Sequence, residues 1–565
     1  MRRRAGTVAM LTVALVLGGT PSGAHAEDDP FDRYNQQQLT WGPCPFTPEE
    51  GALPSECALV TVPRDWAAPD SGVDLQVAIS RVRAAGERLG VVLFNPGGPG
   101  GQGTSLPGAI GALQPALSER YDLIGMDPRG TGQEGGTAPF DCAVPTDRLS
   151  QRTDLDARDR SADSIAEHLK YPRAVAEACQ SDALTPYITT WQTAYDMELI
   201  RQLLAEPALN YVGYSYGTWL GAKYASLFPA SAGKIVLDSS VNWQGRLQAD
   251  FEAWPPINQR MFDDSFLPWT SRQFPDLVGT IPADAGKMWE RVRTFFAEQG
   301  ILAPDTYDAV FVGMGSELRW VVGALILTLG AAELQGTEPT PPAGLRTLFD
   351  EQSTAAFGVP VAGLTTDIVA AALRADDYTH VSGTRYAVAC GDQPTKSARW
   401  YQRLSDRQGP EYPLYGWAYG LSEPCGFWSD APKQELPSLP AEVAGRVLVV
   451  QGELDPQTGY EEARAAVRAA PGVTMVAVDD SPFHGQYTIS GNPCVDGMVN
   501  VFLLRNSRPG NSVCPGVPLL GETEVFPVAG PVTTRAGAQL LAAQALPELR
   551  ESVADRIAAA NGDLR

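Results

Sequence analysis

Short apolar runs alternate with segments of helical periodicity along most of this chain. Residues 90–94 and 121–126 are apolar runs that end in loops rich in Gly and Pro, and a helical pattern covers residues 193–204. Within that pattern Thr193 and Asp196 have the spacing of an N-terminal capping box. The remaining runs predict strands at 210–213, 234–237, 446–450 and 473–478 and a helix at 218–227. Such alternation predicts an α/β fold with a mostly parallel sheet.

The alternation stops between about residues 245 and 440, where the pattern is helical. Seven of the twelve tryptophans lie in this stretch, so it has packing of its own. We interpret residues 245–440 as a large helical cap inserted over the active edge of the sheet. Its apolar run at 320–329 predicts a buried helix, and the prolines of 337–342 predict a surface loop.

The insertion divides the chain into segments. A first part of the α/β core would cover residues 27–244, and a second part would cover residues 441–526. An Ala-rich amphipathic tail follows at 527–565, and the sequence suggests no function for it.

The first residues have the features of a secretory signal peptide. Three arginines at 2–4 precede an apolar stretch at 7–19, and Ala24-His25-Ala26 is a small-x-small cleavage site. The stretch is shorter than the roughly 20 residues that a membrane span requires. We therefore expect residues 1–26 to be removed and the mature chain to be secreted without a membrane anchor.

The net charge and the cysteine content limit the kinds of partner, cofactor and covalent cross-link that we expect. The chain has 43 Lys and Arg against 66 Asp and Glu, a net charge of −23, so nucleic acid and anionic membranes are not expected partners. Neither CxxC nor HExxH occurs, and we expect neither a metal nor another cofactor. Eight cysteines in an exported chain favour disulfides, although 105 pairings are possible. Closeness in sequence suggests the pairs Cys44–Cys57, Cys142–Cys179, Cys390–Cys425 and Cys494–Cys514.

A candidate nucleophile lies between a predicted strand and a predicted helix. Gly213-Tyr214-Ser215-Tyr216-Gly217 matches G-x-S-x-G, the pattern of a sharp turn that presents a serine hydroxyl above a sheet. The pentapeptide alone is common, but its position between a predicted strand and a predicted helix makes the match specific. The following helix N-terminus favours developing negative charge. We predict that Ser215 is the nucleophile.

Position along the chain selects the base. Three histidines remain after signal removal: His168, His380 and His484. The order of triad residues in α/β hydrolases is Ser, acid, His, which places the base after the last strand. We therefore predict His484.

The acid is expected after the preceding strand, where two carboxylates occur. Asp455 stands at the tip of the loop and is our choice, with Glu453 as a local alternative. Asp238, after an earlier strand, is a second alternative. The acid would orient the imidazole and stabilise the imidazolium.

Two backbone N–H groups should stabilise the oxyanion. One is predicted at Tyr216, directly after the nucleophile, and the other in the loop at 95–101. Proline has no N–H, so Gly97 or Gly98 is the expected second donor. The loop lacks the Lys-Ser/Thr ending of a phosphate-binding loop.

These motifs together resemble the secreted tripeptidyl aminopeptidases, α/β-hydrolase serine peptidases related to the prolyl aminopeptidases. The resemblance rests on the Gly-Gly-Pro-Gly loop, on Asp-Pro-Arg-Gly-Thr-Gly at 127–132, on residues 213–217, on Gly-Glu-Leu-Asp-Pro at 452–456 and on His484-Gly485. The segments at 389–392, 425–428 and 494–496 extend it, so that it covers about residues 41–517. One departure is Asn95-Pro96, where prolyl aminopeptidases usually have His before the glycines.

The resemblance implies removal of short peptides, often tripeptides, from free N-termini. Such an enzyme must bind an ammonium group, for which a cap carboxylate is the natural partner. The sequence does not choose among the acidic residues of the cap, and Asp392 is selected only because the resemblance includes it. The candidates are Glu252, Asp263, Asp264, Glu317, Asp376, Asp377 and Asp392.

Two other classes of function remain open. A carboxylesterase or lipase would use the same triad, because the fold does not determine the substrate. A non-catalytic protein with a decayed hydrolase fold is the third possibility, and the presence of Ser215, Asp455 and His484 in the expected order disfavours it.

Overall fold

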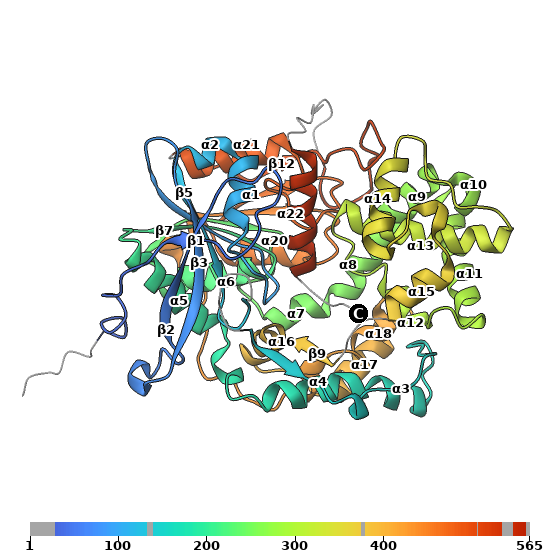
Figure 1. The fold of residues 1–565 in the computed structure, drawn as a ribbon, viewed down its shortest axis with the longest axis horizontal. Helices are drawn as coiled ribbons and strands as arrows, with labels where there is room; N and C mark the ends of the chain where they lie inside the picture. The colour runs from blue at the N-terminus through green and yellow to red at the C-terminus, as the bar shows by residue number, and fades with distance from the viewer. Residues whose placement is uncertain (1–28, 133–138, 375–378, 506, 534–545, 561–565) are drawn as a thin grey trace, which may run out of the picture.

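The computed structural model describes residues 29–132, 139–374, 379–505, 507–533 and 546–560 (Figure 1). The predicted signal peptide and the cap residues Asp376 and Asp377 lie outside these ranges. Within them, no helix is both long and apolar enough to cross a membrane.

A ten-stranded sheet forms the centre of the core, in the order β1-β2-β3-β5-β4-β7-β8-β10-β11-β12. Strands β5 to β12 of this order run parallel, whereas β1, β2 and β3 form an antiparallel edge. The prediction of a mostly parallel sheet is confirmed. The strands are β1 (Gly42–Pro43), β2 (Glu56–Pro63), β3 (Asp74–Val82), β4 (Gly90–Asn95), β5 (Tyr121–Asp127), β7 (Leu209–Tyr214), β8 (Ala232–Asp238), β10 (Val447–Gly452), β11 (Thr474–Val478) and β12 (Ser512–Cys514).

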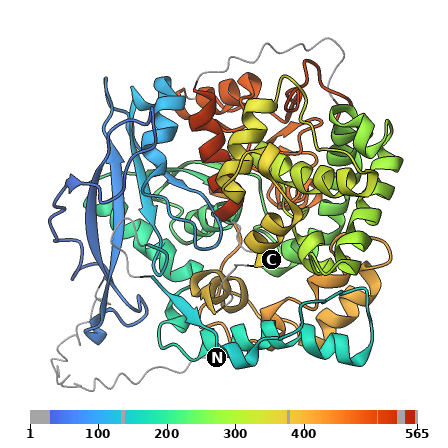
Figure 2. The same ribbon diagram turned by 45° about the vertical axis from the view of Figure 1, so that its right-hand side comes forward.

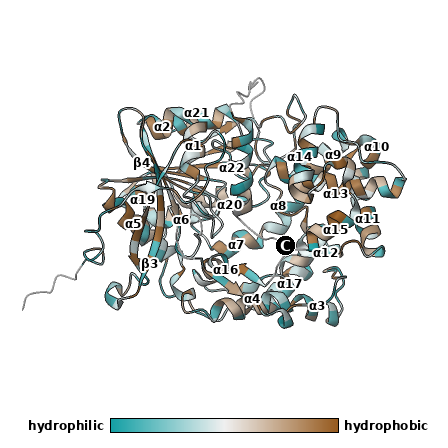
Figure 3. Ribbon diagram, viewed as in Figure 1, coloured by the Kyte–Doolittle hydropathy of each residue, from teal (hydrophilic) through white to brown (hydrophobic). Residues whose placement is uncertain are grey.

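Both faces of the sheet are covered by helices, which explains why its strands are continuous apolar runs (Figure 3). In β4, Val92 and Phe94 belong to one hydrophobic cluster, whereas Val91 and Leu93 belong to the other. Figure 1 shows α1, α2 and α21 on one side of the sheet and α5 and α6 on the other. The core helices are α1 (Leu106–Leu113), α2 (Pro115–Ser118), α5 (Thr190–Leu203), α6 (Tyr216–Leu227), α19 (Ala441–Ala444), α20 (Tyr460–Ala469) and α21 (Pro493–Leu504).

Helix α5 begins earlier than the sequence pattern suggested. Its N-cap is Thr189, whose side chain accepts a hydrogen bond from the Gln192 backbone. The predicted capping box at Thr193 and Asp196 is therefore wrong. Asp196 lies inside the helix and forms a fully buried ion pair with Arg129, at 2.6 Å. A long-range partner determined its position, and the local spacing did not.

The cap lies beside the carboxyl edge of the sheet and is almost entirely helical, as predicted (Figure 1). Its long helix α13 contains the buried run predicted at 320–329. The cap helices are α7 (Leu247–Glu252), α8 (Trp254–Met261), the π-helical turn η4 (Phe262–Phe266), α9 (Leu267–Gln273), α10 (Pro275–Val278), α11 (Pro282–Glu298), α12 (Pro304–Ala309), α13 (Glu317–Gln335), α14 (Arg346–Phe357), α15 (Thr366–Arg374), α16 (Gly383–Gly391), α17 (Ala398–Gln408) and α18 (Gly416–Tyr419).

A second excursion from the core packs against the cap. Strand β6 (Asp141–Ala143) pairs antiparallel with β9 (His380–Ser382), and α4 (Lys170–Gln180) contacts the 3-10 turn η6 (Pro424–Phe427). Strand β6 and helix α4, together with α3 (Ala162–His168), come from the segment between β5 and α5, whereas β9 and η6 belong to the cap. The apolar pattern did not separate this segment from the rest of the core.

Four disulfides join the cysteine pairs suggested by closeness in sequence. They are Cys44–Cys57, Cys142–Cys179, Cys390–Cys425 and Cys494–Cys514.

The C-terminal helix α22 (Pro547–Ala560) returns to the middle of the molecule. It contacts α1 of the core and α13 of the cap. In Figure 2 it is the red helix. The Gln457 side chain donates a hydrogen bond to the carbonyl of Ala558, at 3.1 Å. The tail is therefore packed against the loop that follows β10.

Candidate active site

Ser215 occupies a strained turn between β7 and α6. Its backbone has φ 58° and ψ −126°, a conformation that non-glycine residues rarely adopt. Neither flanking position has room for a side chain, so both must be glycine. A Cβ at Gly213 would lie 2.5 Å from the carbonyl oxygen of Gly217, and one at Gly217 would lie 2.8 Å from Asn95 Oδ1. This geometry is that of a nucleophile elbow.

His484 and Asp455 form a buried pair at the same edge of the sheet. The His484 Nδ1 atom lies 2.9 Å from Asp455 Oδ1 and 3.0 Å from Oδ2. Both side chains are inaccessible to solvent. A carboxylate on Nδ1 favours the tautomer in which that nitrogen carries the proton.

The Asp455 carboxylate is held by its own loop. Oδ1 accepts the backbone N–H groups of Gln457 and Thr458 at 2.8 and 3.0 Å, and Oδ2 accepts the Thr458 hydroxyl at 2.9 Å. Charged acceptors with several donors are strongly oriented. The plane that Asp455 presents to His484 is consequently fixed.

The two alternative acids are engaged elsewhere. Glu453 accepts the backbone N–H groups of Val532 and Asp480, so it anchors the start of the C-terminal tail. Asp238 accepts the N–H groups of Gln486 and Tyr487 at 2.6 to 3.1 Å. Burial raises the pKa of Asp238 to about 8.

Asp238 and Ser239 connect the turn at Ser215 to the loop that contains His484. The backbone N–H of Ser215 donates to the Asp238 carbonyl at 3.0 Å. From the other side, the N–H of Gly485 donates to Ser239 Oγ at 2.6 Å. The end of β8 thus supports both Ser215 and the residue that follows His484.

The other two histidines are remote from this site. His168 at the end of α3 binds Asp305 of α12, with 2.6 Å between Nε2 and Oδ2. His380 is exposed on strand β9.

The loop after β4 crosses directly over the elbow. A Cβ at Gly97 would lie 2.5 Å from the Tyr214 carbonyl and 3.2 Å from the Tyr216 nitrogen. The N–H of Gly97 donates to Asn95 Oδ1 at 3.0 Å. Of the two predicted loop donors, Gly97 is therefore engaged within its own loop, and Gly98 follows it.

Asp392 lies at the end of α16 and is buried against the nucleophile helix. Its Oδ1 accepts the Thr190 N–H at 2.9 Å, and its Oδ2 accepts Trp219 Nε1 at 3.3 Å. Burial raises the pKa of Asp392 to about 6. Both oxygens serve core contacts, which is the pattern of a structural carboxylate.

Three of the other acidic cap candidates have protein partners as well. Glu252 pairs with Arg246 at 3.2 Å, and Asp263 accepts the Gln259 amide at 2.9 Å. Glu317 interacts with Glu551 of the C-terminal helix.

A cavity in the cap contains a carboxylate that the sequence reasoning missed. It is lined by aromatic residues and by Arg385 and Glu423, and has a volume of about 40 Å³. Glu423 directly precedes the Pro424-Cys425 segment, and no local motif distinguishes it from other cap acids. Only the folded cap reveals it.

Comparison with known proteins agrees with the fold and with a hydrolase. A family model described as alpha/beta hydrolase fold matches residues 90–304, and one described as TAP-like protein matches residues 412–514. The chain is an α/β-hydrolase enzyme. It is similar to a tripeptidyl aminopeptidase of Streptomyces coelicolor, with 28% identity over 499 residues that cover 81% of this chain and 83% of the relative.

Two further relatives differ in their named activities. Serine protease Hip1 of Mycobacterium tuberculosis is 24% identical over 518 residues, covering 89% of this hydrolase and 95% of the relative. Carboxylesterase B of Mycobacterium tuberculosis is 28% identical over 557 residues, covering 91% and 98%. The resemblance to tripeptidyl aminopeptidases therefore extends over most of the chain, while the relatives include both peptidases and an esterase.

Proposed function

We propose that this hydrolase is a secreted serine exopeptidase that releases short peptides, tripeptides in particular, from free N-termini. The observation that carries the proposal is the buried His484–Asp455 pair, with 2.9 Å between Nδ1 and Oδ1, at the sheet edge that also presents the Ser215 elbow. The similarity to tripeptidyl aminopeptidases over most of the chain supports the peptide substrate.

The triad would act by acyl transfer. Ser215 Oγ attacks the scissile carbonyl while Nε2 of His484 takes the hydroxyl proton. Asp455 keeps the proton on Nδ1 and stabilises the imidazolium that forms. His484 then protonates the leaving amine, and water releases the acyl peptide from Ser215 in a second half-reaction.

The oxyanion would rest on two backbone N–H groups, those of Tyr216 and Gly98. Tyr216 is the first residue of α6, so its N–H is aligned with the helix dipole. We assign the second donor to Gly98 because the Gly97 N–H is bound to Asn95. Loss of such a donor typically costs about 3 to 4 kcal/mol of transition-state stabilisation.

Secretion is supported by the pattern of residues 1–26 and by the four disulfides, which are stable in oxidising compartments. Culture medium and cell lysate, probed separately with antibody, would locate the enzyme, and N-terminal sequencing of the mature form would show whether cleavage follows Ala26.

A carboxylesterase is the second candidate function. The similarity to Carboxylesterase B over 91% of the chain favours it, and the same three residues would perform ester hydrolysis. The discriminating property is recognition of the substrate amine.

Two matched tripeptidyl aminomethylcoumarin amides test the proposal, one with a free amine and one N-acetylated. We expect the purified mature enzyme to cleave the free-amine substrate alone, and Ser215→Ala to lose that turnover by several orders of magnitude. Equal cleavage of both would indicate an endopeptidase or a broad hydrolase. Cleavage of neither amide, with rapid hydrolysis of short-chain esters, would establish the esterase instead.

A further inference from the structure

The cavity in the cap combines a carboxylate with walls of aromatic rings. Glu423 and Arg385 are its charged lining residues, and its volume is about 40 Å³. That volume holds about three water-sized groups, so an ammonium and its nearest atoms fit, whereas a whole peptide does not. The aromatic walls come from Tyr171, Phe251, Trp254, Tyr386, Tyr415 and Tyr419.

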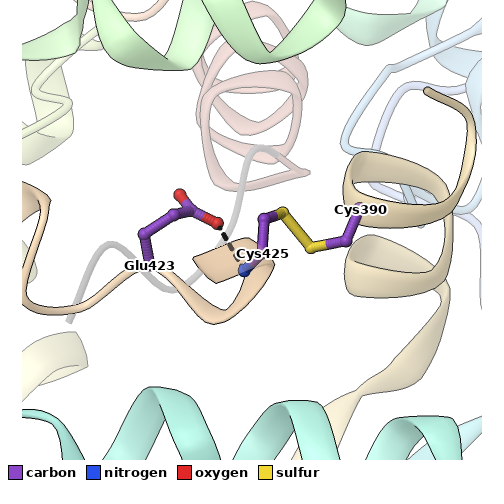
Figure 4. Close-up of side chains that lie close together, drawn as sticks. All are labelled: Cys390, Glu423 and Cys425. Carbon is purple, nitrogen blue, oxygen red and sulfur yellow. Dashed lines mark hydrogen bonds between the residues drawn. A yellow bond between two sulfur atoms is a disulfide. The ribbon is translucent and has the colours of Figure 1, made fainter. Parts of the chain in front are cut away.

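Glu423 is anchored by the backbone that follows it, and the side chain of Tyr419 lies beside its carboxylate. One carboxylate oxygen accepts the backbone N–H of Cys425 at 3.1 Å, and the Cys390–Cys425 disulfide ties this segment to α16. Figure 4 shows the second oxygen directed away from the disulfide. In the part of the chain that the structure describes, no Lys, Arg or His forms a salt bridge with Glu423.

The surroundings favour a cationic ligand. Burial raises the pKa of Glu423, while the hydrogen bond from the Cys425 N–H, the charge of Arg385 and the nearby Tyr419 hydroxyl lower it. The charge of Arg385 acts on Glu423 without a salt bridge between them, so a bound ammonium would be the direct ionic partner of the carboxylate, and the faces of nearby aromatic rings attract cations. Paired carboxylates such as Glu252 offer no equivalent site, because Arg246 already neutralises that group.

Two lining residues of the cavity, Arg385 and Trp254, contact the predicted oxyanion loop and the loop that contains Asp455. On one side, a Cβ at Gly100 of the oxyanion loop would lie 3.7 Å from the backbone nitrogen of Arg385. On the other, Trp254 Nε1 donates to the carbonyl of Gln457 at 2.8 Å, two residues after Asp455. A short peptide acylating Ser215 would therefore extend towards the cavity.

Arg385 adds a donor to this cavity. Its Nη1 atom is buried and has no hydrogen-bond partner among the described residues. The guanidinium carbon lies 5.9 Å from the Trp254 ring centroid and 5.7 Å from that of Tyr386, so both rings limit its movement. A backbone carbonyl of the peptide would satisfy the donor and offset the cost of burying it.

We propose that Glu423 binds the N-terminal ammonium of the substrate in this cavity, and that Arg385 donates a hydrogen bond to a peptide carbonyl beside it. The inference rests on the proposed exopeptidase function. The ligand is the α-ammonium of a short peptide with any side chains, held by an ion pair and aromatic walls. The small volume of the cavity would limit how many residues extend beyond Ser215.

Glu423→Gln tests the ion pair, because it keeps an oxygen for the Cys425 N–H and removes the charge. For a free-amine tripeptidyl aminomethylcoumarin amide we expect KM to rise about 10- to 100-fold, the effect of losing a hydrogen bond between charged groups, with little change in kcat. Hydrolysis of p-nitrophenyl acetate and labelling of Ser215 by a phosphonate should be unchanged. Glu411→Gln is the matched control, since Glu411 is an exposed carboxylate of the same cap segment.

An unchanged KM in a folded Glu423→Gln enzyme would overturn the inference while leaving the exopeptidase function intact. Failure of the wild-type enzyme to prefer the free amine would instead contradict the proposed function itself. If Glu423→Gln does not fold, Glu423→Asp provides the second variant. The wild-type enzyme can also be given a tripeptidyl amide whose α-amine is replaced by hydroxyl, and equal KM values for the amine and hydroxyl substrates would again reject the ammonium site.

Discussion

The backbone N–H of His484 donates to the carbonyl of Gly315 at 2.9 Å, so a loop of the cap directly supports the proposed catalytic base. The approach is close enough that a Cβ on Gly315 would lie 2.4 Å from the Cβ of His484. The cap therefore contacts the proposed triad directly. Asn258 strengthens the connection, because its amide donates to the Pro456 carbonyl and its oxygen accepts the Gly313 N–H.

Gly315→Ala should displace His484 while leaving the fold intact. The added methyl cannot fit beside the His484 Cβ, and a displacement of about 1 Å in a catalytic group costs on the order of 100-fold in rate. We expect kcat to fall by about that factor with little change in KM. Steady-state kinetics on the tripeptidyl amide measure it, with Gly497→Ala as a control within helix α21, where an added methyl meets open space. Wild-type kcat in Gly315→Ala would show that the loop does not position the base.

Asp455→Asn should preserve the shape of the site and lose most of the activity. The amide can present an N–H to His484 Nδ1 and favour the wrong tautomer, which in serine hydrolases lowers kcat by about 10⁴-fold. Glu453→Gln, two residues away, should retain most of its turnover, since Glu453 binds only the Val532 and Asp480 backbones. Measuring kcat for both variants shows which carboxylate is the acid of the triad. A larger loss in Glu453→Gln than in Asp455→Asn would assign that role to Glu453.

Arg129→Met should destabilise the core without touching the reacting groups. Arg129 donates to both Asp196 oxygens, at 2.6 and 2.7 Å, and neither side chain is exposed. Removing one member leaves a buried charge unpaired, at a cost of about 3 to 5 kcal/mol. Thermal melting should show a clear decrease in Tm, whereas Arg33→Met, which breaks a solvent-exposed pair with Asp74, should melt close to the wild type. Equal Tm values for the two variants would contradict the structural role of the buried pair.

The contact between α13 and the C-terminal helix should make stability depend on pH. Burial raises the pKa of Glu317 and raises that of Glu551 from 4.5 to about 7. The folded chain therefore retains protons that the unfolded chain releases above about pH 4.5, and the stability contributed by this pair decreases as pH rises from 4.5 towards 7.

Glu551→Gln removes that dependence. The variant should melt a few degrees above the wild type at pH 8 and close to it at pH 5. Asp555, Arg550 and Arg319 also surround the pair, but they are the same in both proteins and cancel in the comparison. A Tm difference that is equal at pH 5 and pH 8 would show that the Glu317–Glu551 pair does not retain a proton in the folded chain.

Local sequence patterns were sufficient for the framework of the fold. Apolar runs such as 90–94 and 121–126 correspond to β4 and β5 because strands buried on both faces must be continuously apolar. The elbow around Ser215 was also predictable from local sequence, because its glycines avoid clashes with atoms only a few residues away. Disulfide pairs were recognisable because each joins cysteines that are close in the chain.

Choices among residues with the same chemistry required the tertiary structure. Asp238, Glu453 and Asp455 all follow strands that end at one edge, and only the packing of the loops brings the Asp455 carboxylate to His484. Asp392 could not be distinguished from Glu423 by its neighbours in sequence. The sequence determined which elements form and which groups could react; the tertiary structure decided which charges are paired and which face a cavity, because those depend on contacts between segments far apart in the chain.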